Sequence, residues 1–467
     1  MYNTEANEQA VYTYGWDTVF SIPAKDVNQA IRNHHSSPKN FTIDYPTFTV
    51  QADFEDWQIC PGGDGKNVRL SLPMKNGKIH YTKTNKEFSF NSGHAIVEIR
   101  LHYIPHTDNE EGNNGQQHAL VALNQVIDDV PVMSVVSLTT DPPLATVSNA
   151  LTMKALSDWG NANLGDFSHV FATVDLNRSV DREQWGFVTP NYTSYAYLDH
   201  SSFDDSLFAV LTMTQDRTGD SISEEMSPLA IPRGSVAGFL ISQARWLYDL
   251  VRPAVMQAYP GLTEKNFLMT ADATQLYLTD GCSVALSPVQ HGGVTYYPKL
   301  TQLKISSNGQ ILTLTSFTET EIVPGIIATC QSDHWYKITL GNASAGQTIL
   351  FQEAQKPSIV HEIHQTQGSH IAQIVIDVIA AIALIILTIL TSGMALILGG
   401  LVIGLIVGAN HIVPALIEKA NKDDSPAIDL LIANAVSPIR WNSSKAFKLD
   451  YAGLNMSLQL GGNPTFT

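Results

Sequence analysis

Charged residues are scarce in this sequence, and basic residues are the scarcer kind. Asp, Glu, Lys and Arg together make up 15% of the 467 residues, against about a quarter in an average soluble domain. With 27 basic and 44 acidic residues, the formal net charge is −17. Nucleic-acid binding and adsorption on anionic membranes both need basic surface. The composition therefore argues against a nucleic-acid partner and restricts any lipid contact to apolar surface or a local basic pocket.

Cysteine is also rare. The three cysteines, Cys60, Cys282 and Cys330, lie far apart in the sequence. Their spacing matches neither a zinc knuckle nor the framework of a disulfide-rich secreted domain. The sequence predicts three reduced thiols in the protein core.

A secretory signal is missing as well. The first twenty residues contain no basic segment followed by an apolar one, which such a signal requires. We therefore expect synthesis in a cytosol without a signal peptide, and any release by another route.

Motifs that carry catalysis are missing or incomplete. Residues 63–65 (Gly-Asp-Gly) begin like a phosphate-binding loop, but Val68 stands where the third glycine belongs, so a turn is the better interpretation. Residues 342–346 resemble the nucleophile elbow of hydrolases around Ser344, but asparagine replaces the first glycine. The sequence predicts a protein that is not an enzyme and that needs no cofactor.

Three histidines lie close together at His361, His364 and His370. The first two are three residues apart, whereas the helix of a zinc protease places its two histidines four residues apart. These histidines are better explained as polar surface residues that precede the apolar segment, so we predict no metal site.

One long apolar segment stands out. Residues 378–409 contain no charged side chain, and Thr391, Ser392 and Gly393 interrupt the segment near its middle. This pattern predicts two helices of about 18 residues, close to the lower limit for crossing a bilayer. Either the rest of the chain encloses this hairpin, or residues 374–412 insert into a membrane and form a pore.

Elsewhere, strands and helices follow one another in blocks. Period-2 alternation predicts many strands, whereas residues 24–34 and 235–259 have the apolar stripe of a helix. Asn76-Gly77 and Asn308-Gly309 predict hairpin turns. Blocks of this kind favour an α+β fold with antiparallel sheets. We divide the chain into a β-rich half, residues 12–234, and a half with the long helix, a sheet and the apolar hairpin, residues 235–462.

Two stretches resemble a known family. The first is residues 13–20, Thr-Tyr-Gly-Trp-Asp-Thr-Val-Phe, and the second is residues 439–441, Ile-Arg-Trp, with the apolar alternation of residues 447–461. Together they resemble the clostridial 47-kilodalton protein family, found beside botulinum-type and insecticidal toxins in OrfX-type gene clusters. The agreement in length extends this resemblance to the whole chain.

This resemblance implies a fold and a function. The fold would be that of the tubular lipid-binding (TULIP) superfamily, an elongated molecule in which strongly curved antiparallel sheets wrap long helices around an apolar groove. The function would be a non-enzymatic accessory role to a neighbouring toxin, with a lipid or another apolar small molecule as ligand. A neurotoxin-like protein or other cluster proteins would be partners, and membrane contact would be possible. Synthesis would take place in the bacterial cytoplasm, with release in the toxin complex.

Ligand-facing residues are predicted where a helix has more apolar surface than a sheet can cover. The helices of the charge-free segment are apolar on every face, so part of their surface is free to face a cavity, and the helix at 235–259 supplies further candidates. A fully packed core without a cavity is the alternative. The predicted lipid-binding residues are Ile382, Ile386, Ile389, Leu396, Leu401, Leu405, Phe239, Trp246 and Leu250.

Overall fold

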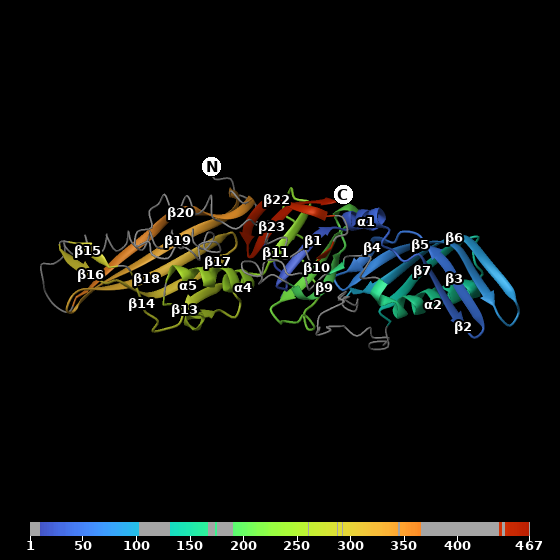
Figure 1. Ribbon diagram of the computed structural model, residues 1–467, viewed down its shortest axis with the longest axis horizontal. Coiled ribbons are helices and arrows are strands. Elements are labelled where there is room, and N and C mark those ends of the chain that lie inside the picture. The colour runs from blue at the N-terminus through green and yellow to red at the C-terminus, as the bar shows by residue number, and fades with distance from the viewer. Residues whose placement is uncertain are drawn as a thin grey trace. The chain divides into compact units, whose positions relative to one another are not determined.

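The computed structural model describes residues 10–101, 131–166, 173–174, 190–259, 261–286, 288–291, 293–343, 346–365, 439–440 and 444–466. The chain divides into two compact units, one built mainly on Thr13–Phe239 and the other mainly on Leu240–Leu431. Figure 1 labels their elements. Each unit has an antiparallel sheet of its own.

The unit built on Thr13–Phe239 contains a six-stranded sheet with one helix packed along it. The strands run in the order β2 (Asn40–Tyr45), β3 (Phe48–Phe54), β5 (Asn67–Tyr81), β6 (Lys86–Arg100) and β7 (Met133–Asp141), with β4 (Gln58–Asp64) paired to β5. Helix α2 (Thr146–Ala162) packs against β2 and β7. Its Trp159 lies among Phe41, Phe54 and Trp57, with ring centroids 5.3–6.3 Å away. This aromatic cluster forms the core between helix and sheet.

The unit built on Leu240–Leu431 contains a seven-stranded sheet of mostly long strands (Figure 1). Their order is β12 (Phe267–Met269), β13 (Gln275–Leu278), β17 (Lys299–Asn308), β18 (Ile311–Val323), β19 (Ile326–Ala343) and β20 (Gly346–Gln365), with β14 (Val284–Ala285) paired to β17. A separate hairpin joins β15 (Val289–His291) to β16 (Val294–Tyr296). A helical segment precedes the sheet and consists of α4 (Gln243–Arg245), the π-helix η4 (Trp246–Val251) and α5 (Arg252–Ala258).

A third sheet joins strands from distant parts of the sequence. Its order is β22 (Ser444–Asn455), β23 (Ser457–Phe466), β11 (Ala237–Ile241), β1 (Thr18–Pro23), β10 (Leu207–Thr214) and β9 (Pro190–Leu198). Helix α1 (Ala24–His34) follows β1 directly and confirms the helix predicted at residues 24–34. The remaining short elements are η3 (Phe203–Asp205), η5 (Glu264–Asn266) and the paired strands β8 (Thr173–Val174) and β21 (Ile439–Arg440).

The predicted fold class is wrong. The protein is mostly β, its three large sheets are antiparallel without strong curling, and no long helix wrapped by a sheet occurs among the described residues. The longest described helix, α2, has 17 residues. The α+β, TULIP-like prediction depended on two long helical units. One of them, residues 235–259, is shorter than predicted and mixes α- and π-helix over residues 243–258. The other, residues 378–409, lies outside the described residues.

The helix predicted at residues 235–259 begins eight residues later. Ala237–Ile241 forms strand β11, and all five of its residues are buried. A consecutive apolar run of this kind fits a strand that is covered on both faces. Ser242 then caps the helical segment, because its side chain accepts a hydrogen bond from the main-chain N–H of Arg245. Leu240 fits a helical stripe by its spacing alone, whereas pairing with neighbouring strands makes residues 237–241 a strand.

The two Asn-Gly pairs behave differently. Asn308-Gly309 makes the predicted hairpin between β17 and β18, with Gly309 at φ +59°. Asn76-Gly77 does not, because β5 continues through it and pairs with β3 and β6 on either side. Gly77 lies opposite Phe90, whose ring occupies the space where a Cβ atom would be. Long-range pairing on both edges thus overrides the local turn preference.

Candidate functional site

The Tyr-Gly-Trp-Asp run at residues 14–17 is a packing motif. Trp16 is fully buried, donates from Nε1 to the carbonyl oxygen of Ser223 over 2.9 Å, and stacks on Tyr192 with ring centroids 6.1 Å apart. Gly15 has φ +98° and lies against Ile222, so this position favours glycine. These contacts fix the chain just before β1.

Asp17 holds the end of strand β10. Its Oδ2 atom accepts hydrogen bonds from the main-chain N–H of Thr214 (2.8 Å) and from the Thr214 hydroxyl (3.1 Å). Two guanidinium nitrogens of Arg217 also donate to it, over 2.9 and 2.7 Å. Asp17 is 5% exposed, and a carboxylate this buried needs such compensation. The whole motif is therefore structural.

Three of the predicted lipid-binding residues lie in the described part of the chain. Phe239 is on β11, and Trp246 and Leu250 are on η4. Their exposed fractions are 1%, 0% and 4%, so all three belong to the core. The other six, from Ile382 to Leu405, lie outside the described residues, so their role stays a prediction.

The helical segment that carries Trp246 packs on the buried face of the long sheet. At its start, Gln243 Nε2 donates to the carbonyl oxygen of Ser307 on β17 over 2.9 Å. Beyond its end, burial and the neighbouring Tyr336 of β19 raise the pKa of Tyr259. Ser307 and Tyr336 belong to one cross-strand row, since each pairs with Leu312 of β18. The segment therefore extends over β17, β18 and β19.

Several polar atoms in this interior layer have no hydrogen-bond partner among the described residues. They are Trp246 Nε1, Ser307 Oγ and both ring nitrogens of His334, and each side chain is at most 2% exposed. Buried polar atoms in native proteins nearly always have a partner. These atoms are therefore the groups of this layer to which a bound molecule could hydrogen-bond.

His334 is neutral in this layer. Burial lowers the pKa of its imidazole to about 4, and the nearby Asp333 opposes this only in part. The ring stacks on Tyr336, with an interplanar angle of 4° and centroids 6.4 Å apart. A neutral imidazole offers one donor and one acceptor to a partner.

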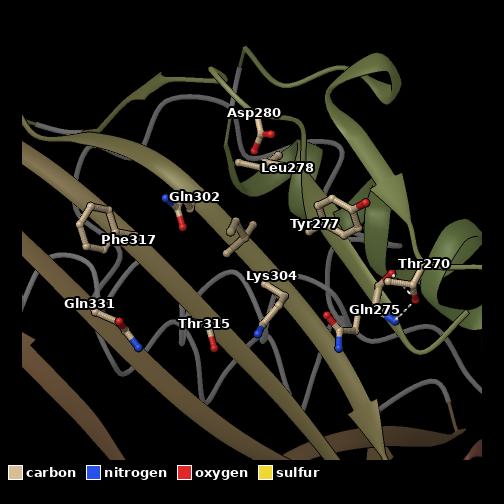
Figure 2. A pocket seen from close by; sticks show the side chains of 11 residues that line it. Thr270, Gln275, Tyr277, Leu278, Asp280, Gln302, Lys304, Thr315, Phe317 and Gln331 are labelled. Carbon is tan, nitrogen blue, oxygen red and sulfur yellow. Dashed lines mark hydrogen bonds between the residues drawn. The ribbon is translucent and has the colours of Figure 1, made fainter.

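A hollow opens on the opposite, exposed face of the same sheet (Figure 2). Its volume is about 400 Å³. Figure 2 shows Gln302 and Lys304 on β17, with Tyr277 of β13 on one side and Phe317 of β18 on the other. The remaining lining residues are Thr270, Gln275, Leu278, Asp280, Leu303, Thr315 and Gln331. No sequence pattern predicts this hollow, because its residues come from separate strands.

The weak catalytic motifs resolve into ordinary structure where they are described. Gly63 and Asp64 end β4, and the Asp64 carboxylate accepts hydrogen bonds from the main-chain N–H groups of Lys66 and Asn67, both 3.0 Å, in the predicted turn. Ser344 lies outside the described residues.

The predictions about histidines and membrane insertion are only partly covered by the structure. His361 and His364 lie on β20 opposite Cys330 and Ile327, and the described residues contain no group of three side chains placed to hold a metal. His370 and the segment 374–412 lie outside the described residues. No helix in the described part of the chain is long and apolar enough to cross a membrane.

The cysteines are free thiols. Cys330 is buried, whereas Cys60 and Cys282 are half-buried. Burial raises the pKa of the Cys60 and Cys330 thiols to about 11 in each case. The prediction of a core position holds for Cys330 and not for Cys60 or Cys282, and the reduced state stays a prediction.

Comparison with known proteins gives the family. The family model for OrfX2, OrfX3 and P47 proteins, described as OrfX-like, matches residues 13–462. The chain belongs to the OrfX/P47 family. It is 33% identical to the OrfX3 protein of Paraclostridium bifermentans, over 97% of this chain and 98% of that protein. It is 30% identical to OrfX3 of Clostridium botulinum strain Kyoto, type A2, over 96% of this chain and 98% of the relative.

A solved structure supports the family fold. P47 of Clostridium botulinum A2 matches this OrfX/P47 chain with a TM-score of 0.64 at 16% identity, over 97% of this chain and 98% of P47. At that identity the likeness shows the fold alone. The resemblance read from residues 13–20 and from the closing strands is confirmed at the family level.

Proposed function

We propose that this member of the OrfX/P47 family is a non-enzymatic accessory protein of a bacterial toxin gene cluster that binds a lipid or another apolar molecule. The accessory role is supported by family membership over residues 13–462. Synthesis in the bacterial cytoplasm and release with a toxin complex belong to the same proposal. A neurotoxin-like protein or another product of the cluster would be the protein partner.

The interior layer of the Leu240–Leu431 unit is the observation that supports an apolar ligand. Trp246, Leu250 and their neighbours form an apolar surface, and the unpartnered atoms of Trp246, Ser307 and His334 lie in the same layer. A lipid combines an apolar chain with a polar end, and its ester, hydroxyl or carboxyl group could accept from the indole N–H. Satisfying one such buried donor contributes roughly 1–3 kcal/mol.

The test is direct extraction. The full chain is expressed, purified without detergent, extracted with an organic solvent, and the extract is analysed by mass spectrometry. We expect one lipid class in near-stoichiometric amount, above the level in an unrelated protein purified from the same cells. A folded protein whose extract contains no lipid above that level contradicts the proposal.

Paired tryptophan variants locate the binding. Trp246→Phe keeps an aromatic ring but removes the unpartnered N–H and part of the indole volume, so we expect it to lower the extracted lipid several-fold. Trp57→Phe makes the same change at a fully buried tryptophan of the other unit and should leave the lipid unchanged. Equal loss in both variants would indicate a general effect of stability, and the interior layer would no longer be supported as the binding region.

A further inference from the structure

The hollow in Figure 2 exists because two short strands share one edge of β17. Strand β14 pairs with Lys299 and Leu300, and β13 pairs with residues 304–306. On that edge, residues 301–303 have no strand partner among the described residues. The pairing of β17 with β18 is also irregular between Leu300 and Gln302. The missing partner strand leaves a gap, and Leu278 and Leu303, both largely buried, line it.

Some of the hydrogen-bonding side chains that line this hollow have no partner among the described residues. The Gln302 amide, the Lys304 ammonium and the Tyr277 hydroxyl have no hydrogen-bond or ion-pair partner within the described part of the chain. Asp280 likewise has no ion-pair partner there. Thr315, in contrast, is fixed, because its hydroxyl donates to Asp333 over 2.6 Å. These four groups together offer both hydrogen-bond donors and hydrogen-bond acceptors to a ligand.

This set of groups selects against several ligand classes. An aliphatic chain would take the amide, the ammonium and the carboxylate out of water without replacing their hydrogen bonds, which is unfavourable. A polyphosphate needs several cations, whereas the lining contains a single one, Lys304, and a carboxylate, Asp280. What remains is a neutral ligand that is rich in groups able both to donate and to accept.

Sugar hydroxyls have that property, because each can donate and accept a hydrogen bond. One face of a pyranose ring also presents C–H groups, which pack on the electron-rich face of an aromatic ring. The hollow offers two such rings, Tyr277 and Phe317, both partly exposed. Its volume of about 400 Å³ is within the range of roughly 300–1,000 Å³ common for small-molecule sites.

We propose that this hollow binds a neutral carbohydrate. The sugar packs on Tyr277 or Phe317, and its hydroxyl groups hydrogen-bond to Gln302 and Lys304. The site is open, since Gln302, Lys304 and Gln331 are exposed. A dissociation constant on the order of 1 mM for a single oligosaccharide is therefore expected. The proposal concerns the exposed face of the sheet and does not depend on lipid in the interior.

Saturation-transfer difference NMR on the full chain tests this inference. Lactose, cellobiose, maltotriose and chitotriose serve as probes, each titrated to about 10 mM, well above the expected constant. We expect at least one probe to show saturation transfer with a millimolar dissociation constant. If none of the four shows saturation transfer, the proposal is overturned.

Variants place the binding in the hollow. Gln302→Ala changes an exposed side chain and should weaken the binding of the active probe about tenfold without changing the melting temperature. Phe317→Ala removes an aromatic surface and should have a similar effect on binding. Thr339→Ala, at a half-buried position farther along β19, is the matched control and should bind as the wild type does. Unchanged binding by folded Gln302→Ala and Phe317→Ala proteins would refute the assignment to this hollow.

Discussion

Acidification should weaken the fold through His334. Its imidazole has a pKa of about 4 in the folded protein, against 6.5 when it is freely solvated. Between these values the unfolded chain binds a proton that the folded chain does not, so stability rises with pH there. The stability that the fold gains from a neutral His334 is fully present above pH 6.5 and is lost as the pH falls towards 4. At 1.36 kcal/mol per pKa unit, about 3 kcal/mol of unfolding free energy is lost by pH 4.

Urea unfolding at pH 7 and at pH 4 measures this loss. Carboxylates also titrate over this range, so the decisive quantity is a difference between variants. In His334→Leu, which lacks the imidazole, the loss of unfolding free energy between pH 7 and pH 4 should be smaller by about 3 kcal/mol than in the wild type. His200→Gln, which removes an exposed histidine, should retain the wild-type loss. Equal losses in the wild type and His334→Leu would refute the reasoning.

Two further changes test other parts of the structure. Asp17→Asn removes the negative charge of a carboxylate that accepts main-chain, hydroxyl and guanidinium hydrogen bonds. Urea unfolding should therefore show a loss of about 2–3 kcal/mol of unfolding free energy. An unchanged unfolding midpoint would contradict the structural role of the motif. In a Cys282→Ser background, the pKa values of about 11 for Cys60 and Cys330 leave about one thiol in a thousand ionised at pH 8. Ellman's reagent should then label the folded protein slowly and the urea-unfolded protein fast, and equally fast labelling of both would contradict this.

Local patterns predicted local structure well. Helix α1 and the hairpin at Asn308-Gly309 follow from amphipathic spacing and from the preference of glycine for a positive φ, and neither needs a distant partner. Asn76-Gly77 carries the same local signal, yet it lies inside β5, which pairs with β3 and β6 before and after it. The segment 237–241 was misassigned for a similar reason, since its burial depends on neighbouring strands. At such positions, pairing with strands distant in sequence, and not local preference, decides which secondary structure forms.

The candidate sites were harder to predict than the family. The motif at residues 14–17 identified the family because it is contiguous, although its side chains serve packing. The carbohydrate hollow depends on how β13 and β14 share the edge of β17, and Tyr277 and Phe317 are forty residues apart. The sequence predicts Trp246 as a ligand-facing residue, whereas its side chain is fully buried and its N–H has no partner among the described residues.

The strand order of the sheet that contains β1 has a consequence for folding. Strand β1 lies between β10 and β11, and β11 lies beside β23, which ends at Phe466. Contacts this distant in sequence slow folding, because long loops must close before they form. During synthesis, β11 lacks its neighbour on one side until β23 has left the ribosome, and an unpaired, wholly apolar edge is prone to aggregate. Production of this chain should therefore depend on protection of β11 until β23 arrives.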